Sequence, residues 1–246
     1  MNKRGAVTVF IILGIVIVAI VGLLFFALSG NIDFKRFTGL QTEPVRDYVE
    51  TCVEESLALN VYNFEQYAGY DGVALAHPHQ GYYVNYLVYN DGSFILNRIN
   101  PKPYLESRIS EDVANHLEYN CLNGVDFGGD TLVDFGSMDV KTEIMPDKVF
   151  VTVDLPINVK KGSVEVNVNN FLVVYDTNFG TIYDAVRDII EDEINLGDFD
   201  PTNYMVENRN IEIIKEVKQD DDRSFIIVYA VKSNDNDEMI VFAVKR

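Results

Sequence analysis

The stretch MDVKTEIMPDKVFVTVDLPINVKKGSVEVNVNNFLVVY, residues 138–175, decides the fold, because its apolar and polar side chains alternate almost throughout. A period of two residues is typical of strands that bury one face and expose the other. Turn-forming pairs interrupt the alternation at Pro146-Asp147 and at Lys161-Gly162. The stretch therefore predicts an antiparallel meander of three strands, at 138–145, 148–160 and 163–175.

A helix and three further strands are predicted after the meander. Thr177 suits the helix cap, and apolar residues then recur at helical spacing, at Ile182, Val186, Ile189, Ile190 and Ile194. A linker at 197–203 precedes three apolar-rich segments, which are IEIIKEVK (211–218), FIIVYAVK (225–232) and MIVFAVKR (239–246). Runs of Asp and Asn separate these segments and hold the hairpin ends in water. The pattern indicates two sheet-rich halves joined around one helix, and a sub-division near 195–205 is one interpretation.

Two helices and a hairpin are predicted before the meander. Pro44 suits the first turn of a helix over 44–60, and a second helix over 105–121 buries Ile109, Val113, Leu117 and Cys121. The intervening residues are irregular except for a hairpin, in which 81–90 and 93–96 flank a turn at Asn90-Asp91-Gly92.

The N-terminal segment AVTVFIILGIVIVAIVGLLFFAL, residues 6–28, contains no charged residue. As a helix it is about 34 Å long, which is enough to cross ~30 Å of hydrocarbon. Lys3 and Arg4 precede it and favour a cytoplasmic N-terminus. We expect residues 1–5 in the cytoplasm, a bilayer-spanning helix at 6–28, a tether at 29–43 and an extracytoplasmic domain at 44–246. The fold class expected is α+β, with antiparallel sheets and about three helices after the transmembrane helix.

The start of the span raises a question of processing. Lys3-Arg4-Gly5 followed by a hydrophobic helix resembles the class III signal of archaeal type IV pilin-like proteins, which are cut after the glycine, here between Gly5 and Ala6. Pilins carry Glu at the fifth mature position, where this chain has Phe10, and that difference puts filament assembly in doubt. Cleavage after Ala27-Leu28-Ser29 is another alternative, and an uncleaved anchor is favoured over both.

The net charge and the cysteine content limit which partners and which compartment suit the domain. The chain has a net charge of −18, and four basic and two acidic residues in 1–44 leave −20 on the remainder. Such a surface repels phosphate backbones, so a nucleic-acid partner is not expected. The two cysteines, Cys52 and Cys121, are predicted to form a disulfide, as suits an even pair outside the cytoplasm. Two buried free thiols are the alternative.

No catalytic, cofactor-binding or metal-binding residue is predicted, and no enzymatic activity or cofactor is expected. Nucleophile-elbow, zinc-protease, P-loop and Rossmann patterns are all missing from the sequence. His77, His79 and His116 lack the further ligands that a metal needs, and Asp112 or water is the expected partner of His116. The acidic runs at 198–203 and 234–238 lack the glycine and terminal glutamate of a calcium loop, so they are interpreted as solvated turns.

Four tyrosines lie close together in the first predicted hairpin, at Tyr82, Tyr83, Tyr86 and Tyr89. They are a candidate surface for a partner or a carbohydrate, because tyrosine combines an apolar ring with a polar tip. The simpler interpretation is that the tyrosines at alternating strand positions pack into the core.

Longer stretches resemble a group of uncharacterised archaeal membrane-anchored proteins. The similar segments are KRGAVTVFIILGIV (3–16), PVRDYVETCVEESL (44–57), the Cys121 helix, DKVFVTVDLPINVKKG (147–162) and the helix at 179–194. The resemblance implies an exported domain with paired cysteines in a single-pass protein of the cell membrane.

The function expected is that of a membrane-anchored structural or interaction protein of the cell surface, with a minor pilin-like subunit as its narrower form. Its partners would be the bilayer, through 6–28, and a protein or other component of the cell envelope. The alternatives are a surface receptor for a glycan or small solute, acting through 81–89, and a surface hydrolase that uses scattered carboxylates.

Overall fold

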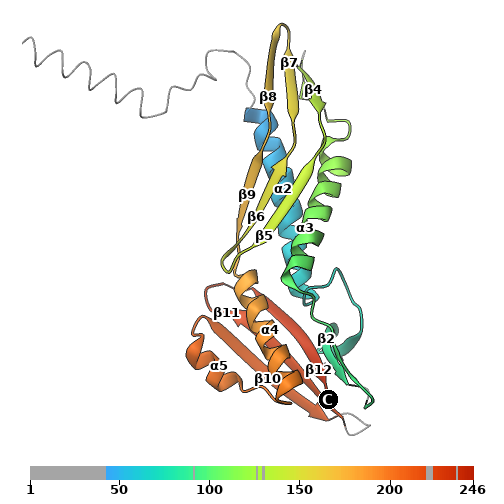
Figure 1. Cartoon of the computed structure of the whole chain (residues 1–246), viewed down its shortest axis with the longest axis vertical. Coiled ribbons are helices and arrows are strands. Elements are labelled where there is room, and N and C mark those ends of the chain that lie inside the picture. Colours follow the sequence, from blue (N-terminus) through green and yellow to red (C-terminus); the bar gives the residue numbers. More distant parts are fainter. Residues whose placement is uncertain (1–42, 91, 126, 129–130, 220–223, 237) are drawn as a thin grey trace, which may run out of the picture. The chain divides into compact units, whose positions relative to one another are not determined.

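A computed structural model describes residues 43–90, 92–125, 127–128, 131–219, 224–236 and 238–246 (Figure 1). The predicted cytoplasmic residues 1–5 with the candidate cleavage site, the span at 6–28 and the tether up to residue 42 lie outside the described residues. Among the residues that are described, no helix combines the length and the apolar character needed to cross a membrane. Residues Thr42–Arg246 form one compact unit.

The predicted meander is present, but each of its long strands is interrupted. Strands β5 (Asp139–Ile144), β6 (Lys148–Asp154) and β9 (Phe171–Asp176) form one antiparallel sheet in the order β5-β6-β9. Strands β7 (Ile157–Lys161) and β8 (Val164–Val168) continue the hairpin into a second sheet, where β4 (Thr131–Phe135) pairs with β7. The prediction of one three-stranded meander is therefore wrong about the length of the strands, because two of them are each divided between two sheets. Strand β4 was not predicted.

Pro156 and Asn170 explain the interruption. Pro156 has no N–H for the ladder, and its carbonyl accepts a bond of 2.7 Å from Gly136 N, at the matching break between β4 and β5. On the partner strand Asn170 adopts a φ of +59°, and only Asn169 and Asn170 lie opposite the three residues 154–156, so the extra residue of this β-bulge is on the Pro156 strand. The register accordingly slips by one between the pairs Val153↔Phe171 and Ile157↔Val168.

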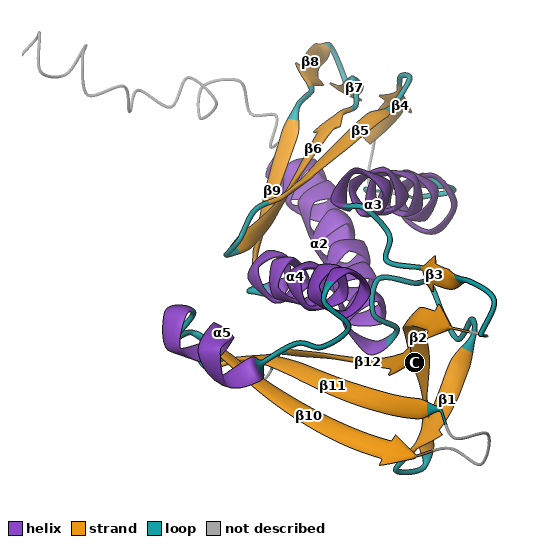
Figure 2. Cartoon of the chain, turned by 60° about the horizontal axis from the view of Figure 1, so that its bottom comes forward, coloured by secondary structure: helices purple, strands orange, loops and turns teal. Residues whose placement is uncertain are grey.

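Two helices cover one face of the β5-β6-β9 sheet. They are α2 (Glu43–Gln66) and α3 (Lys102–His116), which pack on each other and against β9 and β5 (Figure 2). Val149, Val151 and Val153 are fully buried on the covered face, as the alternation predicts. The predicted second helix ends differently, because its last turn, η2 (Leu117–Leu122), is a π-helix.

The C-terminal strands form the largest sheet, in the order β1-β2-β12-β11-β10. The predicted strands appear as β10 (Ile211–Gln219), β11 (Phe225–Ser233) and β12 (Met239–Lys245), and the predicted hairpin as β2 (Tyr82–Asn90) and β3 (Ile95–Asn97). A parallel pairing of β2 with β12 unites the two groups, and β1 (Ala76–His79), in a region predicted to be irregular, extends the edge.

Helix α4 (Phe179–Asn195) packs on β11 and β12 and also contacts β6. Its start is fitted to the β5–β6 turn, where Thr181 N donates to Pro146 O at 3.0 Å. Thr177 lies one residue before the helix cap, Asn178, and its hydroxyl accepts from Phe179 N at 3.0 Å.

A fourth α-helix, α5 (Pro201–Glu207), occupies part of the predicted linker, so the expectation of about three helices is corrected to four within the described residues. Asp200 caps it by accepting from Thr202 N at 2.9 Å, and Pro201 fits its first turn.

Candidate functional site

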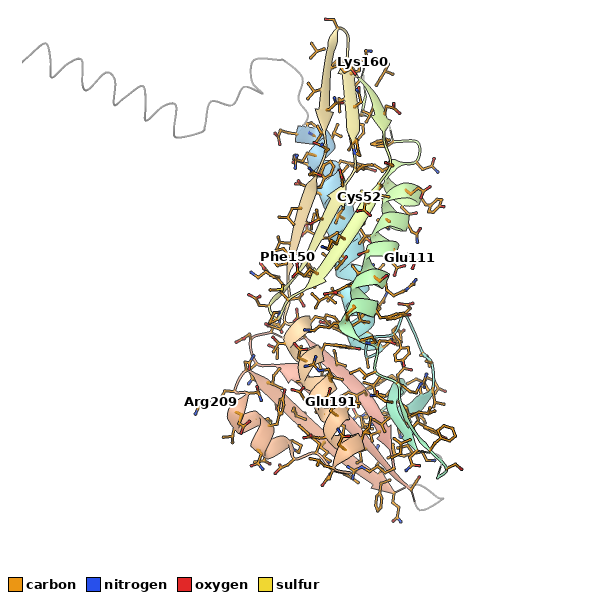
Figure 3. All side chains as sticks on the ribbon, viewed as in Figure 1. Cys52, Glu111, Phe150, Lys160, Glu191 and Arg209 are labelled. Atoms are coloured by element: carbon orange, nitrogen blue, oxygen red, sulfur yellow. A yellow bond between two sulfur atoms is a disulfide. The ribbon has the colours of Figure 1, made fainter. Side chains whose placement is uncertain are left out.

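The α2–α3 pair is held together at the π-helical turn by a disulfide. Cys52 on α2 (Figure 3) is joined to Cys121 on η2, with 6.4 Å between their Cα atoms. This is the pairing that the sequence predicts. Tyr48 adds a second tie, because its hydroxyl donates to Cys121 O at 2.8 Å. The two helices are thus fixed relative to each other beside the turn.

The π-helical turn presents a run of three exposed side chains. Leu117 and Cys121 are buried, whereas Glu118, Tyr119 and Asn120 between them are exposed. The wider turn of a π-helix is rare and is often found at functional sites. Tyr119 is 64% exposed, and its ring makes no hydrogen bond or ring contact within the described part of the chain.

One side of Tyr119 borders an open pocket of about 340 Å³ between α2 and α3. Its lining is rich in carboxamides, from Asn60, Asn63, Asn115 and Asn120, and also includes Asp112 and His116. Asn60 donates to Ser56 O at 2.9 Å, and Asn120 Nδ2 lies 3.0 Å from His116 Nδ1. Asp112 or water was the expected partner of His116, whereas its Nδ1 lies beside Asn120, and Asp112 lies 3.4 Å from Arg108.

Burial raises the pKa of the Asp112 carboxyl, with Asp71 and Glu111 adding to the shift and Arg108 opposing it. The side-chain amides of Asn63 and Asn115 have no hydrogen-bond partner among the described residues. This wall of the pocket therefore offers free donors and acceptors.

The other side of Tyr119 borders a pocket of about 680 Å³. It lies where the β4–β5 strand is interrupted, so Phe135, Ser137 and Met138 line it, with Leu155 from the opposing break. Glu118 and Asn123 supply its further polar groups. Because Tyr119 lines both pockets, one exposed aromatic ring stands between two hollows. We call these two pockets and the ring between them the Tyr119 groove.

The four candidate tyrosines of the β1–β2 hairpin do not share one surface. Tyr82 and Tyr83 are adjacent on β2, so they point to opposite faces. Tyr86 is buried in a small core with Val84, Ile226 and Ala243, and Tyr89 packs against it. The core interpretation therefore holds for Tyr86, and the other rings are distributed over both faces.

Tyr82 and His79 border a smaller cavity of about 180 Å³ on the C-terminal sheet. His79 is buried, and its Nδ1 has no hydrogen-bond partner among the described residues. The volume is below that of ordinary ligand pockets, which begin near ~300 Å³. The cavity is therefore a weaker candidate than the Tyr119 groove.

A buried charge cluster ties α4 to the C-terminal strands. Glu193 is buried, lies 2.6 Å from Arg246 and accepts a hydrogen bond from the Tyr229 hydroxyl. Hydrogen bonds from Lys215 and Arg246 lower the pKa of Asp198 to about 2. The carboxylates of this cluster already have cationic partners, so we interpret it as a structural tie.

The carboxylates of the first candidate calcium loop, at 198–203, likewise have partners. Asp198 is bound to Lys215 and Arg246, and Asp200 caps α5. Across the described ranges, no three His, Cys, Asp or Glu side chains are placed to hold a metal ion together.

The Tyr119 groove was not predicted. No family model matches the chain, and no curated protein and no solved structure matches it either. The site therefore rests on its geometry, which combines an exposed ring, free carboxamides and a covalently fixed pair of helices.

Proposed function

We propose that the chain is a membrane-anchored interaction protein whose acidic α+β domain faces the outside of the cell. The observation that carries the proposal is the Cys52–Cys121 disulfide. Disulfides persist in oxidising compartments and are rare in the cytoplasm. The uncharged segment 6–28 supplies the anchor, and Lys3 and Arg4 before it favour this orientation.

A sheet face that the described residues leave uncovered supports the interaction role. The face of β5-β6-β9 that points away from α2 and α3 bears Phe150, Leu172 and Val174, and Phe150 is paired directly with Val174. Leu172 is 58% exposed. Apolar side chains grouped on a strand surface suit contact with a protein of the cell envelope. The minor pilin-like subunit is the narrower form of this proposal, and it rests on Lys3-Arg4-Gly5 alone.

Protease shaving of intact cells tests the placement. We expect a fragment that contains residues 44–246 to be released without lysis, with Cys52 and Cys121 still linked when it is analysed by mass spectrometry without reduction. A cytoplasmic protein followed in the same sample controls for leakage. Release only after permeabilisation, or alkylation of both cysteines in unreduced cells, would contradict the proposal. The residual membrane peptide reports the mature N-terminus, and one that begins at Ala6 would support the pilin-like form.

A further inference from the structure

We propose that the Tyr119 groove binds a neutral oligosaccharide, with the ring of Tyr119 stacked on one sugar unit and the surrounding carboxamides bonded to its hydroxyls. The inference deepens the proposed function by naming a ligand class, and it relies on that function only for the setting in which such a ligand is met. It places recognition on α2, α3 and η2 and not on the tyrosines of β2.

The exposure of Tyr119 suits stacking on a sugar ring. Tyr119 lies in the middle of a run of three exposed residues and is itself 64% exposed, so its ring covers no core. The face of such a ring is electron-rich, and the C–H groups on the apolar face of a pyranose are weakly electropositive, so the two surfaces attract as they pack. Hollows on both sides of the ring leave room for the sugar units that precede and follow the stacked one.

The carboxamides beside Tyr119 suit the hydroxyl groups of a sugar. Each amide side chain offers two donors and an acceptor in one plane, which matches hydroxyl groups that both donate and accept. Asn63 and Asn115 face the smaller pocket with these groups unused in the described part of the chain. On the other side of the ring, Asn123 and Ser137 provide similar polar groups beside the apolar Leu122 and Met138.

Charge selects a neutral ligand. Asp112 and Glu118 line the two pockets, and neither lining includes a Lys or Arg among the described residues. A phosphate, sulfate or uronate would meet the carboxylates of Asp112 and Glu118 here, and Arg108, the guanidinium beside Asp112, is already bonded to that carboxylate and lies outside the lining. The net charge of −20 on the residues after 44 acts in the same direction at longer range.

The groove is also fixed before a ligand arrives. The disulfide and the Tyr48–Cys121 bond hold the turn that carries Tyr119 against α2. A site that is already ordered loses less conformational entropy on binding, which matters for weak ligands such as sugars.

Calorimetric titration of the full-length chain tests the proposal. The chain is purified in a detergent without a sugar headgroup, because a glycosidic detergent would compete for the groove. The probes are the β-1,4-linked tetrasaccharides of glucose and of N-acetylglucosamine, with tetragalacturonate as the acidic counter-probe. We expect at least one neutral probe to bind with a dissociation constant of about 1 mM or lower and the acidic probe not to bind.

Substitutions locate the binding. Tyr119→Ala should weaken it at least about tenfold, and Tyr119→Phe, which keeps the ring, should leave it within about twofold of the parent. Tyr104→Ala is the matched control, because Tyr104 is an exposed tyrosine at the start of the same helix that lines neither pocket. Asn63→Ala combined with Asn115→Ala should weaken binding while the melting temperature stays constant.

The proposal is overturned if neither neutral tetrasaccharide binds at 10 mM (roughly −2.7 kcal/mol), or if binding is unaffected by Tyr119→Ala. Preferential binding of the acidic probe would overturn it as well. These titrations use purified protein, so their failure leaves the shaving result untouched, and failure of the shaving experiment leaves the groove untouched.

Discussion

Replacing Glu65 by Gln should stabilise the protein at alkaline pH and leave it nearly unchanged at acid pH. Glu65 lies near the end of α2, is only 9% exposed, and its Oε1 has no hydrogen-bond partner among the described residues. Burial, and secondly the negative charge of Glu238, raise its pKa from the ordinary 4.5 to about 8. Tyr175 on β9 lies near the same pair, and its own pKa is raised by burial and then by Glu65 and Glu238.

The sign of the effect follows from proton binding. Below pH ~4.5 the carboxyl is protonated in the folded and the unfolded chain, so its contribution is fully present. Between pH ~4.5 and ~8 the unfolded chain loses the proton and the folded chain keeps it, so the free energy of unfolding falls by about 1.4 kcal/mol for each pH unit. Over the whole window the loss amounts to up to about 5 kcal/mol, and it is complete once the pH passes the folded-state pKa.

Urea unfolding at a series of pH values measures this directly. Glu65→Gln keeps the shape of the protonated side chain and removes its titration, so the difference between variant and parent should grow from near zero at pH 5 to several kcal/mol at pH 8. Glu55→Gln, at an exposed position on the same helix, is the matched control and should change the pH profile little. A constant difference between Glu65→Gln and parent at all pH values would refute the reasoning.

Three further substitutions test the rest of the framework. Replacing Cys52 and Cys121 together by Ala should lower the free energy of unfolding in urea by about 4 kcal/mol, because the bond closes a loop with a sequence separation of 69. An unchanged urea midpoint would show that the disulfide does not contribute to stability. Gly180→Ala should lower the free energy of unfolding by more than ~3 kcal/mol, because its Cβ would collide with the backbone of Met145 and Pro146, whereas Gly72→Ala meets no atom within 4 Å and should be neutral. Arg246→Met should cost about 3 kcal/mol by leaving Glu193 buried without its nearest cation, and Lys218→Met on β10 is the exposed control. Equal losses for the two would show that the buried pair has no special weight.

The strands were predictable because each follows one strong local pattern, but the break in the meander was hidden. On β6 and β7 the odd-numbered residues stay buried straight through Pro156, so the alternation reveals no interruption there. On the partner strand the phase does change. Val168 is buried before Asn169-Asn170, and Phe171 and Val173 are buried after it, so the buried positions change from even to odd numbers where two residues face three on the other strand. That change of phase was the available signal for the bulge.

Helix α5 and the π-helical turn were missed for different reasons. Helix α5 has 7 residues, too few to show a periodicity, although Asp200-Pro201 is a good start signal. The π-helical turn follows the pattern of an ordinary helix up to Cys121, since Val113, Leu117 and Cys121 are spaced by four. The Tyr119 groove depends on that turn and on Asn side chains from two helices far apart in the sequence. A single-sequence pattern does not specify how two such helices face each other, so the groove could not be assembled before the structure.

The Cys52–Cys121 disulfide bears on both the location of the domain and the rigidity of the Tyr119 groove, for different physical reasons. For the location of the domain, only the existence of the bond between Cys52 and Cys121 matters, because redox conditions decide whether it forms. For the groove, the identity of the joined elements matters, because a bond from α2 to η2 fixes the backbone two residues from Tyr119. A disulfide needed for stability alone would do equally well wherever it closed a loop of similar length. Stability does not require the disulfide to lie at the turn that carries the exposed Tyr119 ring. A binding groove that is fixed before the ligand arrives does require that position.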